Sequence, residues 1–165
     1  KCKPMNRDTP TPPDTRPNGK PDTGGVCHDL PSPYLPHPAT GLLHLPRFLA
    51  KIRKHLDGEL PKSYQRNFTR GFDAFLCMHL GIDPEQVVDL VRAHREDPAA
   101  LERALLDLLP EDPRPAQWNR ELVQKGVWGM GRESLEDAKA KMGIPHREDL
   151  RSFADMIEFD EDRLD

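Results

Sequence analysis

Apolar residues recur at steps of three and four along most of residues 46–160, which is the spacing of one face of an α-helix. Pro46 precedes the first such stripe, and proline is tolerated in a first helical turn because that N–H has no intrahelical partner. Gly58 can end the helix in a left-handed conformation. The pattern therefore predicts a helix between Pro46 and Gly58, with an apolar stripe of Phe48, Leu49, Ile52 and Leu56.

Six further segments show the same period. One continuous helix is predicted from Ser63 to a stop at Gly81, and two later helices begin at the pairs Asp83–Pro84 and Asp97–Pro98. In each pair the aspartate caps the helix and the proline is its first residue, and Gln86 completes a capping box. Three more helices are expected around Trp118, Leu135 and Phe153.

The fold expected from this pattern is all-α, because no strand-like alternation of apolar and polar residues occurs. We expect a compact single domain of six or seven short helices around one core, mostly antiparallel because the connections are short.

The two ends of the chain differ from this helical part. Ten of the 18 prolines lie in residues 1–38, and residues 1–30 contain no apolar run or helical period. Such a segment buries too little apolar surface to offset its conformational entropy. We therefore expect a disordered Pro-rich arm over residues 1–38 and a helical domain over residues 39–165, with a frayed acidic tail at 158–165.

The composition indicates in which cellular compartment the protein is expected. The arm lacks the apolar core of a secretory signal, and no stretch approaches the roughly 20 apolar residues that span a bilayer. The three cysteines are scattered and odd in number, which argues against a disulfide framework. Cys77 is expected to be a small buried hydrophobic residue. These features favour a cytoplasmic protein without membrane association.

Charge is unevenly distributed. Residues 47–70 carry seven cations and two carboxylates, whereas residues 147–165 carry three cations and eight carboxylates. One interpretation is that the two segments face each other in the fold or are exposed to solvent. The other is that the basic segment binds an anionic small molecule or an acidic protein partner.

The motifs of the common catalytic and cofactor sites are absent from the sequence. It has no Gly-rich phosphate loop, no Cys-x-x-Cys pair, no His-Glu-x-x-His and no Gly-x-Ser-x-Gly. No two of the seven histidines have the i, i+4 spacing that places imidazoles on one helix face. We therefore predict no catalytic residue, no metal and no cofactor, and leave enzymatic activity open.

One cluster of residues is a candidate binding site. Asp73 is turned partly toward the core, and a carboxylate there needs a cation, for which Arg47 or Lys51 is the natural candidate. The cluster is a structural ion pair between two helices, a polar pocket for an anion near a helix start, or a set of unconnected surface residues. Its members are His44, Arg47, Lys51, Tyr64, Arg70 and Asp73.

Nucleic acid is a poor fit as a partner. The segment 79–94 has the outline of a helix-turn-helix, but its second helix carries Glu85 and Asp89 where cations would be needed. The phenylalanines near the basic segment keep core spacing rather than the interleaving of a stacking surface.

The stretches "GLLHLPRFLAKIRKHL", "LPKSYQRNFTRGFDAFLCMHLGID" and "WNRELVQKGVWG", in this order, resemble the bacterial family known as domain of unknown function 5069. The resemblance covers roughly residues 31–165 and implies a small cytoplasmic bacterial domain, but no activity. The residues that carry it are Leu45, Pro46, Arg47, Leu60, Pro61, Tyr64, Gly71, Phe72, Asp73, Gly81, Ile82, Asp83, Trp118 and Asn119.

These observations favour a non-catalytic helical binding domain with an anion-accepting face around Arg47 and Lys51. The alternatives are a small enzyme that uses Asp73 with Tyr64 or His44 as acid and base, and a structural self-assembly protein. A pocket of roughly a few hundred Å³ enclosing Asp73 and a histidine would favour the enzyme. A flat basic face would favour a protein partner, and an exposed apolar stripe around Trp118 would favour self-assembly.

Overall fold

A computed structural model describes residues 25–165 of the chain, and this part contains helices and no β-strand. The expected all-α fold is therefore confirmed. The eight helices of this part are α1 (Leu45–Leu56), α2 (Lys62–Gln65), α3 (Phe72–Leu80), α4 (Pro84–Ala93), α5 (Pro98–Leu108), α6 (Pro115–Gln124), α7 (Gly129–Lys141) and α8 (Phe153–Asp160).

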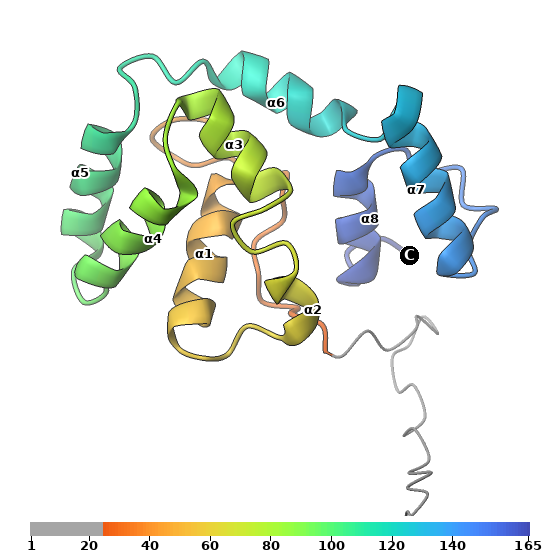
Figure 1. Cartoon of the computed structure of the whole chain (residues 1–165), viewed down its shortest axis with the longest axis horizontal. Coiled ribbons are helices and arrows are strands. Elements are labelled where there is room, and N and C mark those ends of the chain that lie inside the picture. Colours follow the sequence, from red (N-terminus) through yellow and green to blue (C-terminus); the bar gives the residue numbers. More distant parts are fainter. Residues whose placement is uncertain (1–24) are drawn as a thin grey trace, which may run out of the picture.

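Helix α1 is the centre of the larger group of helices. It packs against α3 and α4, and α4 packs against α5 (Figure 1). Helix α6 contacts α3 at one side and α8 at the other, so it connects this group to the pair formed by α7 and α8 (Figure 1).

The predicted helix starts at the Asp-Pro pairs are confirmed. The Asp83 carboxylate accepts a hydrogen bond from the Glu85 N–H, and the Gln86 side-chain oxygen accepts one from the Asp83 backbone N–H, which completes the capping box. Asp97 accepts the N–H of Ala100 in the same way. These caps need only neighbours in sequence, so the sequence alone is sufficient to identify them.

The single helix predicted from Ser63 to Leu80 is wrong, because the chain breaks between α2 and α3. Thr69 and Gly71 both have positive φ, 60° and 54°, which a right-handed helix does not allow. The Thr69 N–H donates instead to the carboxylate of Asp73 at 3.0 Å. Because of this break, residues 25–165 contain eight helices, whereas at most seven were expected.

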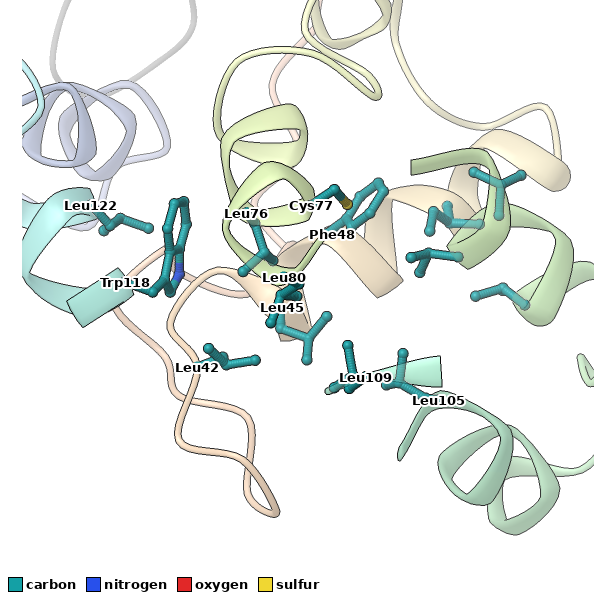
Figure 2. Close-up of a cluster of buried hydrophobic side chains, with 14 of the residues drawn as sticks. Leu42, Leu45, Phe48, Leu76, Cys77, Leu80, Leu105, Leu109, Trp118 and Leu122 are labelled. Carbon is teal, nitrogen blue, oxygen red and sulfur yellow. The ribbon is translucent and has the colours of Figure 1, made fainter. Parts of the chain in front are cut away.

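Two hydrophobic clusters form the interior. The larger one gathers buried side chains from α1, α3, α4, α5 and α6, and Figure 2 shows Trp118 of α6 between Leu122 of the same helix and Leu76 of α3. The smaller one lies between α7 and α8 and consists of Leu135, Leu150, Met156 and Phe159.

The expected boundary between arm and domain at residue 38 is too late. Cys27, Leu30 and His37 are all buried, and the Arg47 guanidinium donates to the carbonyl oxygen of Pro31 at 3.0 Å. Side-chain donors from distant helices hold this segment, so it needs no helical period of its own. The disorder expected for residues 1–24 falls outside the described residues.

The frayed tail expected at 158–165 is also wrong. Helix α8 extends to Asp160, and the next residue, Glu161, is only 4% exposed. Arg163 donates to the carbonyl oxygen of Leu30 and to the carboxylate of Glu158. The acidic tail is thus fixed by contacts with residues far away in the sequence, with Leu30 through Arg163 and with Arg47 through Glu161.

None of the helices described for residues 25–165 is long and apolar enough to cross a bilayer.

Candidate functional site

A cavity of about 990 Å³ lies between the α1–α3 part of the fold and the α7–α8 pair. Residues of α1, α2, α3, α7 and α8 line it, together with the turn between α6 and α7. Its lining includes five of the six predicted site residues, namely His44, Arg47, Lys51, Tyr64 and Arg70. Asp73, the sixth, is completely buried behind them.

Asp73 is the centre of one buried network. Its Oδ2 accepts a hydrogen bond from Lys51 Nζ at 2.7 Å, and its Oδ1 lies 2.6 Å from Nε2 of His44. Of the two cations predicted as partners for Asp73, Lys51 is therefore the one that pairs with it. The predicted ion pair between the first helix and the Asp73 helix exists, and it forms one wall of the cavity.

The electrostatics of this network favour an ionised Asp73 beside a neutral His44. Burial raises the pKa of Asp73, but the His44 hydrogen bond and the Lys51 charge outweigh it, so the pKa is lowered. For His44, burial lowers the pKa more than Asp73 raises it. The pKa of Lys51 is also lowered by burial, against the opposing effect of Asp73.

His44 has two unusual features. Its backbone is left-handed, with φ of 72°, at the N-cap of α1, yet its side chain makes no capping hydrogen bond. Its Nδ1 is buried and has no hydrogen-bond partner, the one such side-chain atom found in residues 25–165. A strained backbone and an unsatisfied buried polar atom both cost stability, and both occur more often at functional sites.

Arg47 belongs to a second buried network, centred on Glu161. The guanidinium donates two hydrogen bonds to this carboxylate, at 2.8 and 2.5 Å. Arg163 Nη2 donates to it at 2.7 Å, and the Tyr64 hydroxyl donates to it at 3.1 Å. Glu161 thus explains a cation in the first turn of α1, where the helix dipole alone would disfavour one.

Tyr64 is fixed by the same network. Its hydroxyl also accepts a hydrogen bond from the Cys27 N–H at 3.0 Å. Burial and the nearby Glu161 charge raise the pKa of Tyr64, so the phenol stays protonated at neutral pH.

Three cations of the cavity have no carboxylate partner among residues 25–165. They are Lys62 of α2 together with Arg66 and Arg70 of the α2–α3 connection. Of these only Arg70 was predicted as a site residue. Lys62 and Arg66 belong to the basic segment 47–70, but the sequence does not show which of its cations are already paired.

A fourth cation lies across the cavity on the α6–α7 turn. Lys125 Nζ is 4.2 Å from the centre of the Phe75 ring, a cation–π distance. No charge cluster marks Lys125 in the sequence, so only the fold brings it to the site.

The remaining walls are largely apolar. The apolar side chains there are Phe72, Phe75, Met142, Phe153, Met156 and Ile157, and the polar side chains of Ser63, Asn67 and Asp160 also line the cavity.

The described residues show no arrangement suited to a metal or to thiol chemistry. No group of three or more His, Cys, Asp or Glu side chains in residues 25–165 is placed to hold a metal ion. Cys27 and Cys77 are free and buried. Burial, with Asp73 and Asp83 nearby, raises the pKa of Cys77 to about 12, as expected for a buried hydrophobic residue rather than a nucleophile.

Comparison with known proteins gives a family but no relative of known activity. No curated protein and no solved structure matches the chain. Residues 30–163 match the family described as Domain of unknown function (DUF5069). Because this match covers most of the chain and agrees with the resemblance found in the ordered sequence stretches, the protein belongs to the DUF5069 family.

Proposed function

We propose that the cavity binds a small molecule that carries an anionic group and an apolar body. The observation that carries this proposal is a set of three cations at a cavity with largely apolar walls. These cations, Lys62, Arg66 and Arg70, have no carboxylate partner among residues 25–165. A volume of about 990 Å³ is in the range of small-molecule sites. A concave site of this kind fits a small molecule better than the flat face of a protein partner.

The anion-accepting residues differ from those first expected. Arg47 and Lys51 are 4% and 5% exposed and already paired with Glu161 and Asp73. An anion that displaced either carboxylate would leave that carboxylate buried and unpaired, which is costly. The proposal therefore assigns the anionic group to Lys62, Arg66 and Arg70, and gives the two buried pairs the role of a rigid wall.

The start of α3 adds to the positive potential at the same place. Gly71 and Phe72 line the cavity, and Phe72 is the first residue of the helix. The helix dipole is positive at this end, while the Asp73 N–H already donates to the carbonyl oxygen of Arg70 at 3.1 Å. An anion held by Arg70 would lie near this positive end of the helix.

Self-assembly through the helix around Trp118 receives no support from the fold. Trp118 and Leu122 are both fully buried in the larger core. The Trp118 indole N–H donates to the carbonyl oxygen of Leu43 at 2.8 Å, so this stripe already has its partner within the chain.

The proposal includes binding in a bacterial cytoplasm. Free thiols at Cys27 and Cys77 suit a reducing compartment. Detection of the native protein in the soluble cytosolic fraction of its host would agree with this, and detection in the periplasm would contradict it.

The binding proposal is tested by isothermal titration of the full chain with octanoate, 3-phenylpropanoate and propyl phosphate. We expect at least one of them to bind, and binding to weaken as salt is raised, because exposed charges are screened. Arg66→Gln combined with Arg70→Gln should weaken binding roughly tenfold or more, as expected for charge-assisted hydrogen bonds.

Arg103→Gln is the matched control, since Arg103 is an exposed cation of α5 and does not line the cavity. It should leave the affinity unchanged. If none of the three compounds binds, or if Arg103→Gln weakens binding as much as the double variant, the proposal is wrong.

A second candidate function is acid–base catalysis, and the close pairing of His44 with Asp73 favours it. A neutral imidazole held by a carboxylate can take a proton from water, and the resulting hydroxide can attack an ester carbonyl. The leaving alkoxide would then recover the proton from His44. The test is hydrolysis of 4-nitrophenyl hemisuccinate, and equal rates for the wild type and His44→Asn would exclude this candidate.

A further inference from the structure

His44 of the cavity wall has a buried side-chain nitrogen without a hydrogen-bond partner. Buried polar atoms in proteins nearly always have hydrogen-bond partners, and an exception calls for a physical reason. Nδ1 of His44 is such an exception, and the residue lines the cavity.

Asp73 determines which hydrogen-bonding role is left to Nδ1. Nε2 lies 2.6 Å from the Asp73 carboxylate, which can only accept, so Nε2 carries a proton and donates it. In a neutral imidazole the other nitrogen then has a lone pair and no proton. Nδ1 is therefore an acceptor without a donor.

Charge balance keeps the imidazole neutral. The single negative charge of Asp73 is already matched by Lys51, 2.7 Å away on α1. Arg47, also on α1, is paired with Glu161, so no negative charge near His44 is left to balance a second proton on the imidazole. A proton on Nδ1 would thus create an excess positive charge in a buried place, which is unfavourable.

The backbone conformation at position 44 does not explain why this residue is a histidine. A left-handed N-cap with φ of 72° suits glycine or asparagine better than histidine. The side chain also does not cap the helix. The imidazole is placed there at a cost in strain, and the Asp73 hydrogen bond uses only one of its two nitrogens.

We propose that Nδ1 of His44 accepts a hydrogen bond from the ligand, so that the ligand is an anion that also carries a hydroxyl or N–H donor. This inference rests on the proposed binding function and narrows the class of ligand to compounds such as hydroxy acids and hydroxylated phosphates. Nδ1 is covered by neighbouring atoms, so contact requires a side-chain shift. We assign this shift to Phe72, whose ring lies 5.5 Å from the imidazole and is partly buried.

The test uses pairs of compounds that differ only in hydroxyl groups. The pairs are octanoate with 3-hydroxyoctanoate, 3-phenylpropanoate with 3-phenyllactate, and propyl phosphate with glycerol 3-phosphate. We expect the hydroxylated member of at least one pair to bind the full chain roughly tenfold tighter, since it satisfies a buried acceptor.

Two variants separate this role from a structural one. His44→Gln can donate its amide N–H to Asp73 as Nε2 of His44 does, but it places no acceptor at the Nδ1 position, so the preference for the hydroxylated member should disappear. Asp73→Asn can donate its amide N–H to Nε2 while its oxygen faces Lys51. This hydrogen bond leaves Nε2 of His44 without a proton and places the proton on Nδ1. The preference for the hydroxylated compound should therefore disappear in this variant as well. His146→Asn, at an exposed position, is the control that should change nothing.

Nitrogen-15 NMR of the histidine side chains gives a second measurement. The His44 signals, identified by their loss in His44→Asn, should show an unprotonated Nδ1 that shifts when the hydroxylated compound binds. A protonated Nδ1 at neutral pH overturns the inference. Equal affinity for both members of every pair, or a preference that survives His44→Gln, also overturns it while the binding proposal stands. Failure of all six compounds to bind removes the binding proposal itself.

Discussion

Replacement of Glu161 by glutamine should destabilise the protein far more than its place in an acidic segment suggests. The substitution keeps the size of the side chain and removes its charge. Arg47 would then remain as a buried cation without a carboxylate, because its two hydrogen bonds to a side chain both go to Glu161.

The size of the effect follows from this geometry. Removing one partner of a buried ion pair costs about 3–5 kcal/mol. The glutamine amide still offers an oxygen acceptor, and Arg47 keeps its hydrogen bond to the Pro31 carbonyl oxygen, so we expect the lower end, about 3 kcal/mol. For a chain of 165 residues this corresponds to a fall in the unfolding midpoint of about 6–12 °C.

Urea denaturation followed by circular dichroism measures this free energy, provided that the denaturant slope stays the same. Asp137→Asn is the matched control, because its ion pair with Lys141 is exposed at 64% and 77% and is worth under about 0.5 kcal/mol. The double variant Arg47→Met with Glu161→Gln should be more stable than Glu161→Gln alone, since it removes the unpaired charge.

A loss below about 1 kcal/mol for Glu161→Gln would refute the reasoning, because that is the range of an exposed pair. A double variant that is even less stable than Glu161→Gln would show that the unpaired Arg47 charge is not the source of the cost.

Three further predictions concern single positions. Because the pKa of His44 is lowered in the folded chain, the unfolded chain binds a proton there that the folded chain does not. Stability should therefore fall as pH drops below about 6.5. Urea titrations at several pH values should show a shallower dependence of stability on pH for His44→Asn. A Cβ at Gly126, where φ is +94°, would lie 3.1 Å from the Phe153 ring and 3.3 Å from its backbone nitrogen, whereas one at Gly143, with φ of +75°, meets nothing within 4 Å. Gly126→Ala should therefore cost at least about 1 kcal/mol more than Gly143→Ala, and equal costs would contradict the clash. The Cys77 thiol, with its pKa raised to about 12 by burial, should resist iodoacetamide at pH 8 until the protein is unfolded, and rapid labelling of the native chain in peptide mass spectra would disprove its burial.

The sequence by itself determines the helices whose signals are local. Asp83 and Asp97 each cap a helix through atoms within three residues, so the residue types and their spacing are sufficient. The apolar period likewise identifies Phe48 and Ile52 as buried positions of the first helix. The cluster of His44, Lys51 and Asp73 was also predictable, because a carboxylate turned toward the core needs a cation or hydrogen-bond donors.

Only the tertiary structure decides which charges pair. Arg47 meets Glu161, 114 residues away, while Asp73 takes Lys51 and His44. The same Asp73 carboxylate accepts the Thr69 N–H and helps to break a helix that the apolar period makes continuous. Pairing energies depend on distance and burial, and neither is encoded in local spacing. For that reason the sequence shows a basic segment and an acidic one, whereas the fold decides which cations are neutralised and which, such as Arg66 and Arg70, are left to face the cavity.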